Sequence, residues 1–375
     1  MVGFEVTILG SMGGPLDGGT QSLMLKSKGS TNSGYICIDA GSGLRQLIRL
    51  TLKSKVWDCN MVESYYRNDF EPAAKFHSAG SSITYGLGTL SNRMRKLMNA
   101  KYNDELDAAN KLPKTNGNII SAIDRGYELY HEIGEIFITH AHLDHIAALI
   151  INSPIVQHGE KIVLGSNSTI DALQKHIFND QIWPNTVNGK GANLRLQPIE
   201  TDKVYISRSI PTWKIIAFQS SHGRTIIGQK PFHSMSYLLQ DTTDGDSLLV
   251  FGDVESDLTS GTNSLVSLWT YLAENVPLSR LRGIIVECSS IDLKDESLLY
   301  GHMSPRHIIA ELKTLKQSYN KSLDGLSIIL THIKMEPMDE DPRLLILSEL
   351  REKSLKATLG NIRFSVAIQG YTHFL

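Results

Sequence analysis

Hydrophobic and polar positions alternate in short blocks, which predict strands near the N-terminus and a mixture of strands and helices after residue 135. The runs Phe4–Leu9, Ser22–Lys26 and Tyr35–Asp39 are rich in β-forming residues, and a glycine-rich turn, Gly10–Thr20, follows the first run. The later strands expected are Ile136–Thr139, Lys161–Leu164, Trp213–Phe218, Met235–Gln240, Leu248–Phe251, Gly283–Glu287, Ser327–Thr331 and Arg363–Ile368. The helices expected are Asp144–Asn152, Thr169–Asn179, Ser264–Glu274, Pro305–Ser318 and Pro342–Lys356. This alternation favours a layered α/β architecture with sheet inside and helices outside.

The stretch from about 44 to 131 has a different pattern. It is polar and mixed in charge, and it shows helical spacing in pieces such as Leu90–Leu97. We therefore expect one domain over residues 1–375 with a mostly helical insertion over about 44–131. The mixed charge and scattered apolar residues of the insertion are also compatible with a homo-oligomer, which the sequence leaves open.

Composition narrows the class of partner. The 375 residues include 37 basic and 39 acidic side chains, a formal net charge of −2. A nucleic-acid polymer is not expected as a partner, because proteins that bind one usually carry a basic excess. The sequence shows neither a signal-peptide pattern nor a run of about 18 apolar residues, so no membrane association is expected. The three cysteines, Cys37, Cys59 and Cys288, have no CxxC spacing and suit a reducing compartment, which predicts a cytoplasmic protein.

The run Thr139–His145 carries the strongest chemical signal, because His140, His142, Asp144 and His145 lie within six residues. His140 and His142 are two residues apart and point the same way in an extended chain. Asp144 and His145 stand where the chain is expected to turn into a helix. Four such groups together would repel one another or lie unsatisfied without a cation. Imidazole and carboxylate ligands suit Zn²⁺, Mn²⁺ or Fe²⁺, and zinc is the default for a histidine-rich set.

Three more potential ligands, His222, Asp253 and His332, follow predicted strands, where sites in layered α/β proteins gather. The count of ligands then fits two divalent ions. One ion would be bound by His140, His142 and His222. The other would be bound by Asp144, His145 and His332. Asp253 would bridge the two ions. Two ions about 3.5–4 Å apart can bind a shared hydroxide and clamp a phosphoryl oxygen.

The HxHxDH motif, followed by a histidine, an aspartate and a histidine in that order, resembles the metallo-β-lactamase superfamily. The turn Asp39-Ala-Gly41 is similar to the early Asp-x-Gly turn of that superfamily. The resemblance covers the chain from Phe4 to His332 outside the insertion. It implies an αββα sandwich with the site at one sheet edge.

A narrower resemblance involves the run from His140 to Pro154, which ends in Asn-Ser-Pro. This run is similar to the signature of class II cyclic nucleotide phosphodiesterases, the low-affinity type known from fungi. The segments Phe178–Pro184, Val286–Ser289 and Tyr300–Pro305 are also similar to that family. Ala148 departs from the glycine or serine expected there, but alanine is small too.

The resemblance implies hydrolysis of cyclic AMP and cyclic GMP to nucleoside 5′-monophosphates by a metal-bridged hydroxide. The departing 3′ oxygen needs a proton, and His302, in a loop before a predicted helix, is the candidate general acid. Glu287 ends a strand and could accept a hydrogen bond from it, as in a similar pair of tRNA-processing nucleases of the superfamily. Asp144 is assigned to the catalytic set as well as to the metal ligands. Asp39 and Thr139 are candidates for orienting the histidines, or plain turn and strand residues.

Other functions remain open at this point. An RNA 3′ nuclease of the same fold would need a basic arm, and a thioesterase would normally lack the pair Glu287 and His302. A non-catalytic cyclic-nucleotide sensor would be built on a dead site, whereas all the expected metal ligands are present. These remain the alternatives to a phosphodiesterase.

Overall fold

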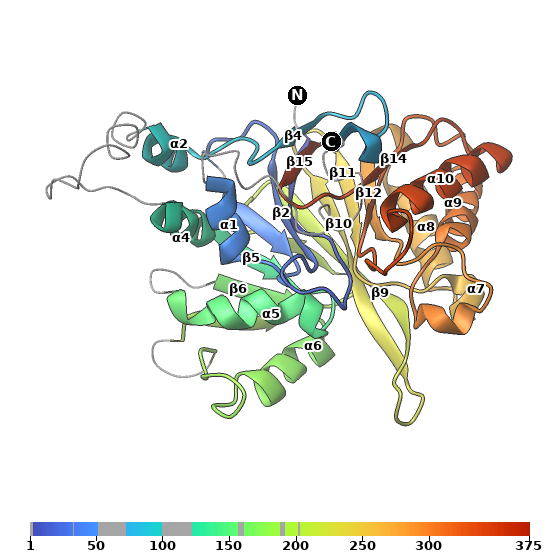
Figure 1. The fold of residues 1–375 in the computed structure, drawn as a ribbon. Helices are drawn as coiled ribbons and strands as arrows, with labels where there is room; N and C mark the ends of the chain where they lie inside the picture. The colour runs from blue at the N-terminus through green and yellow to red at the C-terminus, as the bar shows by residue number, and fades with distance from the viewer. Residues whose placement is uncertain are drawn as a thin grey trace, which may run out of the picture.

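The computed structural model describes residues 3–32, 34–51, 73–99, 122–156, 161–187, 192–201 and 203–375. Two β-sheets face each other, and helices cover their outer faces (Figure 1). The first sheet has the strand order β4-β15-β1-β2-β3-β5-β6-β7, and the second has the order β14-β13-β12-β11-β10-β9-β8.

The bounds of the elements are as follows. The strands are β1 Phe4–Gly10, β2 Ser22–Ser27, β3 Tyr35–Ile38, β4 Ile83–Tyr85, β5 Ile133–Phe137, β6 Lys161–Gly165, β7 Leu194–Pro198, β8 Val204–Ile206, β9 Trp213–Arg224, β10 Pro231–Asp241, β11 Ser247–Phe251, β12 Leu281–Glu287, β13 Ser327–Thr331, β14 Arg363–Val366 and β15 Tyr371–Phe374. The α-helices are α1 Leu44–Thr51, α2 Asn92–Asn99, α4 Ala122–Glu132, α5 Leu143–Asn152, α6 Asn167–Ala172, α7 Asp257–Ser260, α8 Ser264–Asn275, α9 Pro305–Tyr319 and α10 Pro342–Lys356. Shorter helical segments are η3 Ala73–Phe76, η4 Ser153–Ile155, η5 Leu173–Ile177, η6 Leu278–Arg280 and η7 Glu296–Leu299.

Apolar side chains fill three layers. The layer between the sheets includes Phe4, Phe137, Trp213, Tyr237 and Ile329, all fully or almost fully buried. A second layer lies under α1, α4 and α5, and a third under α8, α9 and α10. Full burial of one such side chain is worth about 1.5–3 kcal/mol. This αββα sandwich confirms the fold class expected from the sequence. No described helix is long and apolar enough to cross a membrane.

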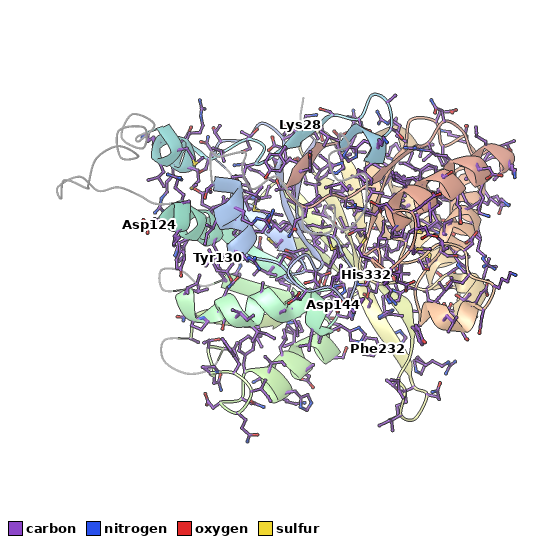
Figure 2. All side chains as sticks on the ribbon, viewed as in Figure 1. Lys28, Asp124, Tyr130, Asp144, Phe232 and His332 are labelled. Carbon is purple, nitrogen blue, oxygen red and sulfur yellow. The ribbon has the colours of Figure 1, made fainter. Side chains whose placement is uncertain are left out.

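Parallel strand pairing brings the candidate functional residues to one edge of the sheets. Strands β3, β5 and β6 run parallel to one another, and so do β11, β12, β13 and β14. The carboxyl ends of parallel strands meet at one edge of a sheet, where side chains from distant segments come together. Asp144 and His332, 188 residues apart, lie near each other at this edge (Figure 2).

Buried Glu135 of β5 ties the two sheets together. Its carboxylate accepts hydrogen bonds from the Tyr205 hydroxyl of β8 at 2.6 Å and the Ser207 hydroxyl at 2.5 Å. It also accepts from the backbone N–H groups of Arg208 and Ser209, both at 3.0 Å. A buried carboxylate is tolerated when its oxygens are satisfied in this way. The strand that leads into the HxHxDH run is therefore anchored at its start.

The insertion is not purely helical over the residues that the structure describes. The helices α1, α2 and α4 fit the expectation, and α2 overlaps the predicted piece Leu90–Leu97. However, β4 adds a strand to the edge of the first sheet by pairing with β15. Only three residues long and half-exposed, β4 has no apolar run that could reveal it. The rest of the expected insertion, 52–72 and 100–121, lies outside the described residues.

The hairpin of β9 and β10 is longer than the sequence predicts. The expected strands were Trp213–Phe218 and Met235–Gln240, whereas the ladder continues to the pair Pro231 and Arg224. Backbone pairing extends the hairpin past the buried apolar residues, so hydrophobic patterning missed the outer part. Figure 1 shows the hairpin projecting from the body of the molecule.

Two histidines, His77 and His373, meet beside β15, the strand next to the edge strand β4. His373 of β15 is 2% exposed, and the His77 ring meets it edge-on with centroids 5.4 Å apart. His373 Nε2 and both ring nitrogens of His77 have no hydrogen-bond partner among the described residues. Burial lowers the pKa of His373 to about 3, and the charge that His77 could carry adds to this shift, whereas burial by itself lowers the pKa of His77 to about 4. Both rings are therefore neutral in the folded protein at neutral pH.

This pair predicts loss of stability in mild acid. The unfolded chain binds protons on histidine near pH 6.5, whereas folded His373 does so only near pH 3, so stability is lost as the pH falls below 6.5. We expect His373 to contribute roughly 2–3 kcal/mol of this loss by pH 4.5. Urea unfolding at pH 7 and pH 4.5 measures it. His373→Phe should flatten the pH dependence, and the exposed control His176→Gln should not. An equal pH dependence in His373→Phe and the parent protein would contradict the prediction.

Candidate metal centre

The side chains expected to bind metal surround one point at the shared sheet edge. His140 and His142 lie between β5 and α5, and Asp144 and His145 lie in the first turn of α5. The other three come from the second sheet: His222 from the outer part of β9, Asp253 just after β11, and His332 just after β13. Figure 2 shows Asp144, His332 and Phe232 near the root of the β9–β10 hairpin.

Three histidines and one carboxylate form the first group of potential ligands. His140, His142, His222 and Asp253 each offer one atom, and these atoms lie within 4.8 Å of one another. His140 Nε2 is 2.8 Å from His142 Nδ1. Asp253 Oδ2 is 3.6 Å from His140 Nε2 and 3.5 Å from His222 Nε2. Three imidazole lone pairs and a carboxylate thus face one small space.

The second group lies against the first. Asp144, His145 and His332 also offer atoms within 4.8 Å of one another. His332 Nε2 is 3.0 Å from Asp144 Oδ2 and 3.3 Å from His145 Nε2. Asp253 Oδ1 is 3.3 Å from His332 Nε2, while its Oδ2 faces the first group and also lies 3.3 Å from His145 Nε2. Asp253 therefore occupies the bridging position between the groups.

Hydrogen bonds on the far side of the rings fix which nitrogen faces the centre. His145 Nδ1 lies 2.7 Å from Asp39 Oδ2, and His222 Nδ1 donates to the Gly301 carbonyl at 2.9 Å. His332 Nδ1 lies 3.2 Å from Ser289 Oγ. In each case Nε2 is left for the centre, as is usual for histidines that bind metals.

Without a cation, burial and neighbouring charges shift the pKa values of these histidines in opposite directions. Burial disfavours the charged imidazolium of His145, but the carboxylates of Asp253 and Asp39 outweigh it and raise its pKa well above the ordinary value. At His140, by contrast, burial prevails, and together with the charge of His145 it lowers the pKa well below the ordinary value. A divalent cation would relieve this competition, because neutral imidazoles and carboxylates are its ligands. The donor set therefore fits divalent metal binding.

The turn that carries Asp39 depends on two unusual backbone features, a positive φ at Asp39 and a close contact at Gly41. Its φ is +59°, a left-handed conformation that aspartate tolerates better than most residues. The carboxylate accepts from Thr139 N at 2.8 Å and from Thr139 Oγ1 at 3.0 Å, as well as facing His145. A Cβ on Gly41 would lie 1.8 Å from the carbonyl oxygen of Asp144. The Asp-Ala-Gly turn can therefore pack against the ligand-bearing helix only with glycine there.

Glu287 and His302 form a buried pair beside the centre. Glu287 Oε1 accepts from His302 Nδ1 at 2.8 Å and from Val254 N at 2.8 Å. Its Oε2 accepts from Ser289 Oγ at 2.7 Å. A ring nitrogen of His302 lies within 4.8 Å of ligand atoms of Asp253 and His332. Burial opposes charge on His302, but the Glu287 carboxylate prevails and raises its pKa, which favours the imidazolium.

Sequence reasoning missed several residues that support the centre. Ser289 links Glu287 to His332, and Phe232 stacks on His142 with the ring centroids 4.7 Å apart and the planes 5° from parallel. Ser289 belongs to the segment Val286–Ser289, singled out only by resemblance, and no local pattern marks Phe232. Trp183 donates to Ser153 Oγ at 3.1 Å and packs against the core.

Comparisons with known proteins agree with this geometry. A family model described as class-II cAMP phosphodiesterases matches residues 77–370. The chain is 37% identical to 3′,5′-cyclic-nucleotide phosphodiesterase 1 of Saccharomyces cerevisiae, with 100% of both proteins covered. It is 27% identical to a 3′,5′-cyclic-nucleotide phosphodiesterase of Candida albicans, with 98% of both covered.

Solved structures give the same picture. The crystal structure of unliganded yeast PDE1 matches with a TM-score of 0.88 at 37% identity, and all of both chains is covered. The metallo-β-lactamase fold protein YhfI of Bacillus subtilis matches with a TM-score of 0.52 at 13% identity, again over 100% of both chains. The second likeness concerns the fold alone.

The contacts of Asp39 generate a prediction about metal affinity. Asp39→Asn keeps the turn, because asparagine also tolerates positive φ, but it removes the charge that faces His145 Nδ1. We expect zinc affinity to fall by about 10–100-fold, the usual effect of losing such a partner. Competition with a chromogenic chelator measures it, with the exposed Asp171→Asn as control. An unchanged zinc affinity in folded Asp39→Asn protein would show that Asp39 does not orient a ligand.

Proposed function

The chain belongs to the family of class-II cAMP phosphodiesterases, and we propose that the centre at its sheet edge performs the hydrolysis with two divalent cations, most simply zinc. The protein is an enzyme that hydrolyses 3′,5′-cyclic nucleotides, as its named relatives do. The observation that carries the proposal is the convergence of two groups of ligand atoms on the two oxygens of Asp253.

Each cation would have its own ligands. The ligands of the first would be His140, His142 and His222, those of the second Asp144, His145 and His332, and the shared ligand Asp253. When bound, two such ions supply a nucleophile at neutral pH and neutralise charge on the phosphoryl oxygens. The hydrolysis adds water to phosphorus, breaks the bond between phosphorus and the 3′ oxygen, and leaves the nucleoside 5′-monophosphate.

His302 would act as the general acid. Glu287 accepts from Nδ1, so the other ring nitrogen, Nε2, is the one available to donate a proton to the departing 3′ oxygen. The same carboxylate raises the pKa of His302 against the effect of burial and so maintains the proton to be donated. Glu287 acts through His302 and is a positioning residue for it.

Asp144 would contribute to the reaction beyond holding a cation. Its side chain is 25% exposed, more than that of Asp253 at 3%, so it can reach a water molecule from solvent. Burial opposes its charge, but the hydrogen bond from His332 and the charge of His145 hold its pKa well below the usual range. The ionised carboxylate can thus accept a hydrogen bond from the attacking water and orient it.

A cytoplasmic location is part of the proposal. Cys37 and Cys288 are buried as free thiols, which suits a reducing compartment. Cys59 lies outside the described residues.

Metal removal tests the reaction. We expect zinc-loaded protein to convert cyclic AMP or cyclic GMP into the 5′-monophosphate, and chelator-stripped protein to lose at least about a hundredfold of that activity, because the ions supply several kcal/mol of charge stabilisation. Chromatography of the nucleotides identifies the product, and elemental analysis counts the ions. Folded, zinc-loaded protein that turns over neither nucleotide would refute the phosphodiesterase assignment.

Substitution of His302 tests the acid. We expect His302→Ala to keep its zinc content and to lose about 10²–10⁴-fold of kcat for cyclic AMP. The loss should be much smaller with bis(4-nitrophenyl) phosphate, because 4-nitrophenolate leaves without a proton.

The exposed neighbour His233→Ala serves as the matched control, and it should keep both activities. An equal loss on both substrates in His302→Ala would indicate a structural or metal-binding role for His302 instead of proton donation.

A further inference from the structure

Two pockets border the centre. The first has a volume of about 510 Å³, lies between the glycine-rich loop 14–18 and helix α5, and reaches the centre at Asp144. The second, of about 1210 Å³, lies beneath the β9–β10 hairpin and reaches the centre at His142 and His222. We propose that the nucleoside of the cyclic nucleotide binds in the first pocket, which we call the α5 pocket. The proposal rests on the proposed function and adds where the substrate's base is recognised.

The surface of the α5 pocket suits a flat ring. Leu143, Ala147 and Ile151 are four residues apart and share one face of α5, and Leu16 belongs to the facing loop. Leu143 is 67% exposed and Ile151 is 61% exposed. Neighbouring exposed apolar side chains that line one pocket form the kind of apolar surface that marks a ligand-binding groove. A volume of about 510 Å³ is within the range of small-ligand pockets, roughly 300–1,000 Å³.

The glycine-rich loop connects the pocket to the centre. A Cβ on Gly13 would lie 2.8 Å from the His332 ring, so the loop passes directly against a candidate metal ligand. The next residues of the loop, 14–18, form the wall of the pocket. A phosphate at the centre and a base between the loop and α5 would therefore belong to one continuous site. The glycine-rich loop acquires a role in this way.

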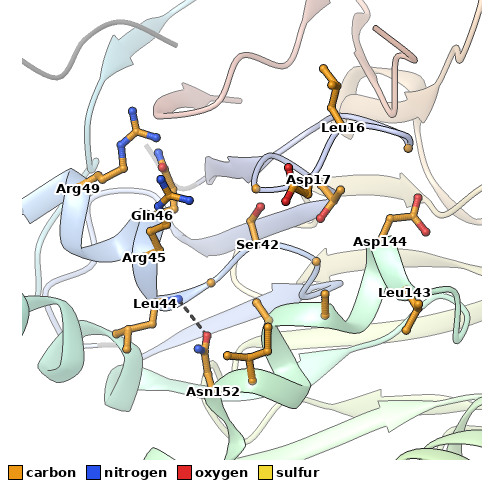
Figure 3. Close-up of a pocket in the computed structure, with 18 of the residues that line it drawn as sticks. Leu16, Asp17, Ser42, Leu44, Arg45, Gln46, Arg49, Leu143, Asp144 and Asn152 are labelled. Atoms are coloured by element: carbon orange, nitrogen blue, oxygen red, sulfur yellow. Dashed lines mark hydrogen bonds between the residues drawn. The ribbon is translucent and has the colours of Figure 1, made fainter. Parts of the chain in front are cut away.

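Charge favours the α5 pocket over the hairpin pocket. Arg45, Arg49 and Asp17 line it, together with Asp144, whose charge the proposed cation would neutralise, and Figure 3 shows both arginines at the end opposite Asp144. The other pocket, beneath the β9–β10 hairpin, has one arginine, Arg224, and two carboxylates, Glu255 and Glu296, of which Glu296 is 3.0 Å from the guanidinium of Arg306. A cyclic nucleotide carries one negative charge, so the pocket with the positive excess is the better match. Guanidinium N–H groups can also donate to purine N7, an acceptor that adenine and guanine share.

Calorimetry measures the contribution of the base to binding. Zinc-loaded protein is titrated with 5′-AMP, the product, and with ribose 5-phosphate, which is the same molecule without the base. We expect Ile151→Gln and Arg45→Gln each to raise the dissociation constant of 5′-AMP about tenfold, within the range for one lost contact in a pocket. The dissociation constant of ribose 5-phosphate should stay within about twofold of its wild-type value. Neither residue is a candidate metal ligand and both side chains are exposed, so folding should not be affected.

The matched control is Ile227→Gln at the tip of the hairpin, where the side chain is 90% exposed and lines the other pocket. This variant should bind both ligands with dissociation constants within about twofold of the wild-type values. A loss confined to 5′-AMP in Ile227→Gln, equal losses for both ligands in the α5 variants, or no loss in them would overturn the proposal. So would wild-type protein that binds 5′-AMP no more tightly than ribose 5-phosphate. Protein that binds 5′-AMP as expected but hydrolyses no cyclic nucleotide would refute the proposed function and leave the α5 pocket standing.

Discussion

The buried carboxylate of Asp253, faced by imidazoles from both sheets, is the constraint around which this molecule is organised. His140, His145 and His222 approach one of its oxygens and His332 the other. Such a concentration of polar groups in a protein interior is costly unless each group has a partner. The surrounding structure supplies these partners on the outer side of the rings, and the proposed cations would supply them on the inner side.

Close backbone contacts make that arrangement reachable. The turn after β3 approaches the helix that bears Asp144 only because Gly41 has no side chain. In the same way, the lack of a side chain at Gly13 lets its loop lie against the His332 ring. Gly301, with a φ of +83°, lies against Gly223 and offers its carbonyl to His222. A Cβ on Gly301 would lie 2.7 Å from the Gly223 nitrogen, so the loop that carries His302 and the strand that carries His222 are fitted to each other.

Chemistry and recognition are divided between different parts of the fold. The candidate ligands and the pair Glu287 and His302 lie at the ends of buried strands, where packing allows little movement. The α5 pocket is lined by a loop and by exposed helix faces, which can vary in sequence without disturbing the strands. In this arrangement the same centre could be kept while the surface that contacts the base changes.

The sequence by itself determined the fold class and nominated the chemical groups. The strands β11, β12 and β13 contain continuous apolar runs, and the cluster from His140 to His145 is local, so both could be read from neighbouring residues. Short or half-exposed elements such as β4 and the outer part of β9 could not, because backbone pairing with distant strands creates them. Tertiary structure alone decided that Asp253 stands between the two ligand groups, that Ser289 joins Glu287 to His332, and that Phe232 stacks on His142. These relations depend on the register and crossing of segments far apart in the chain, and local pattern carries no information about such distances.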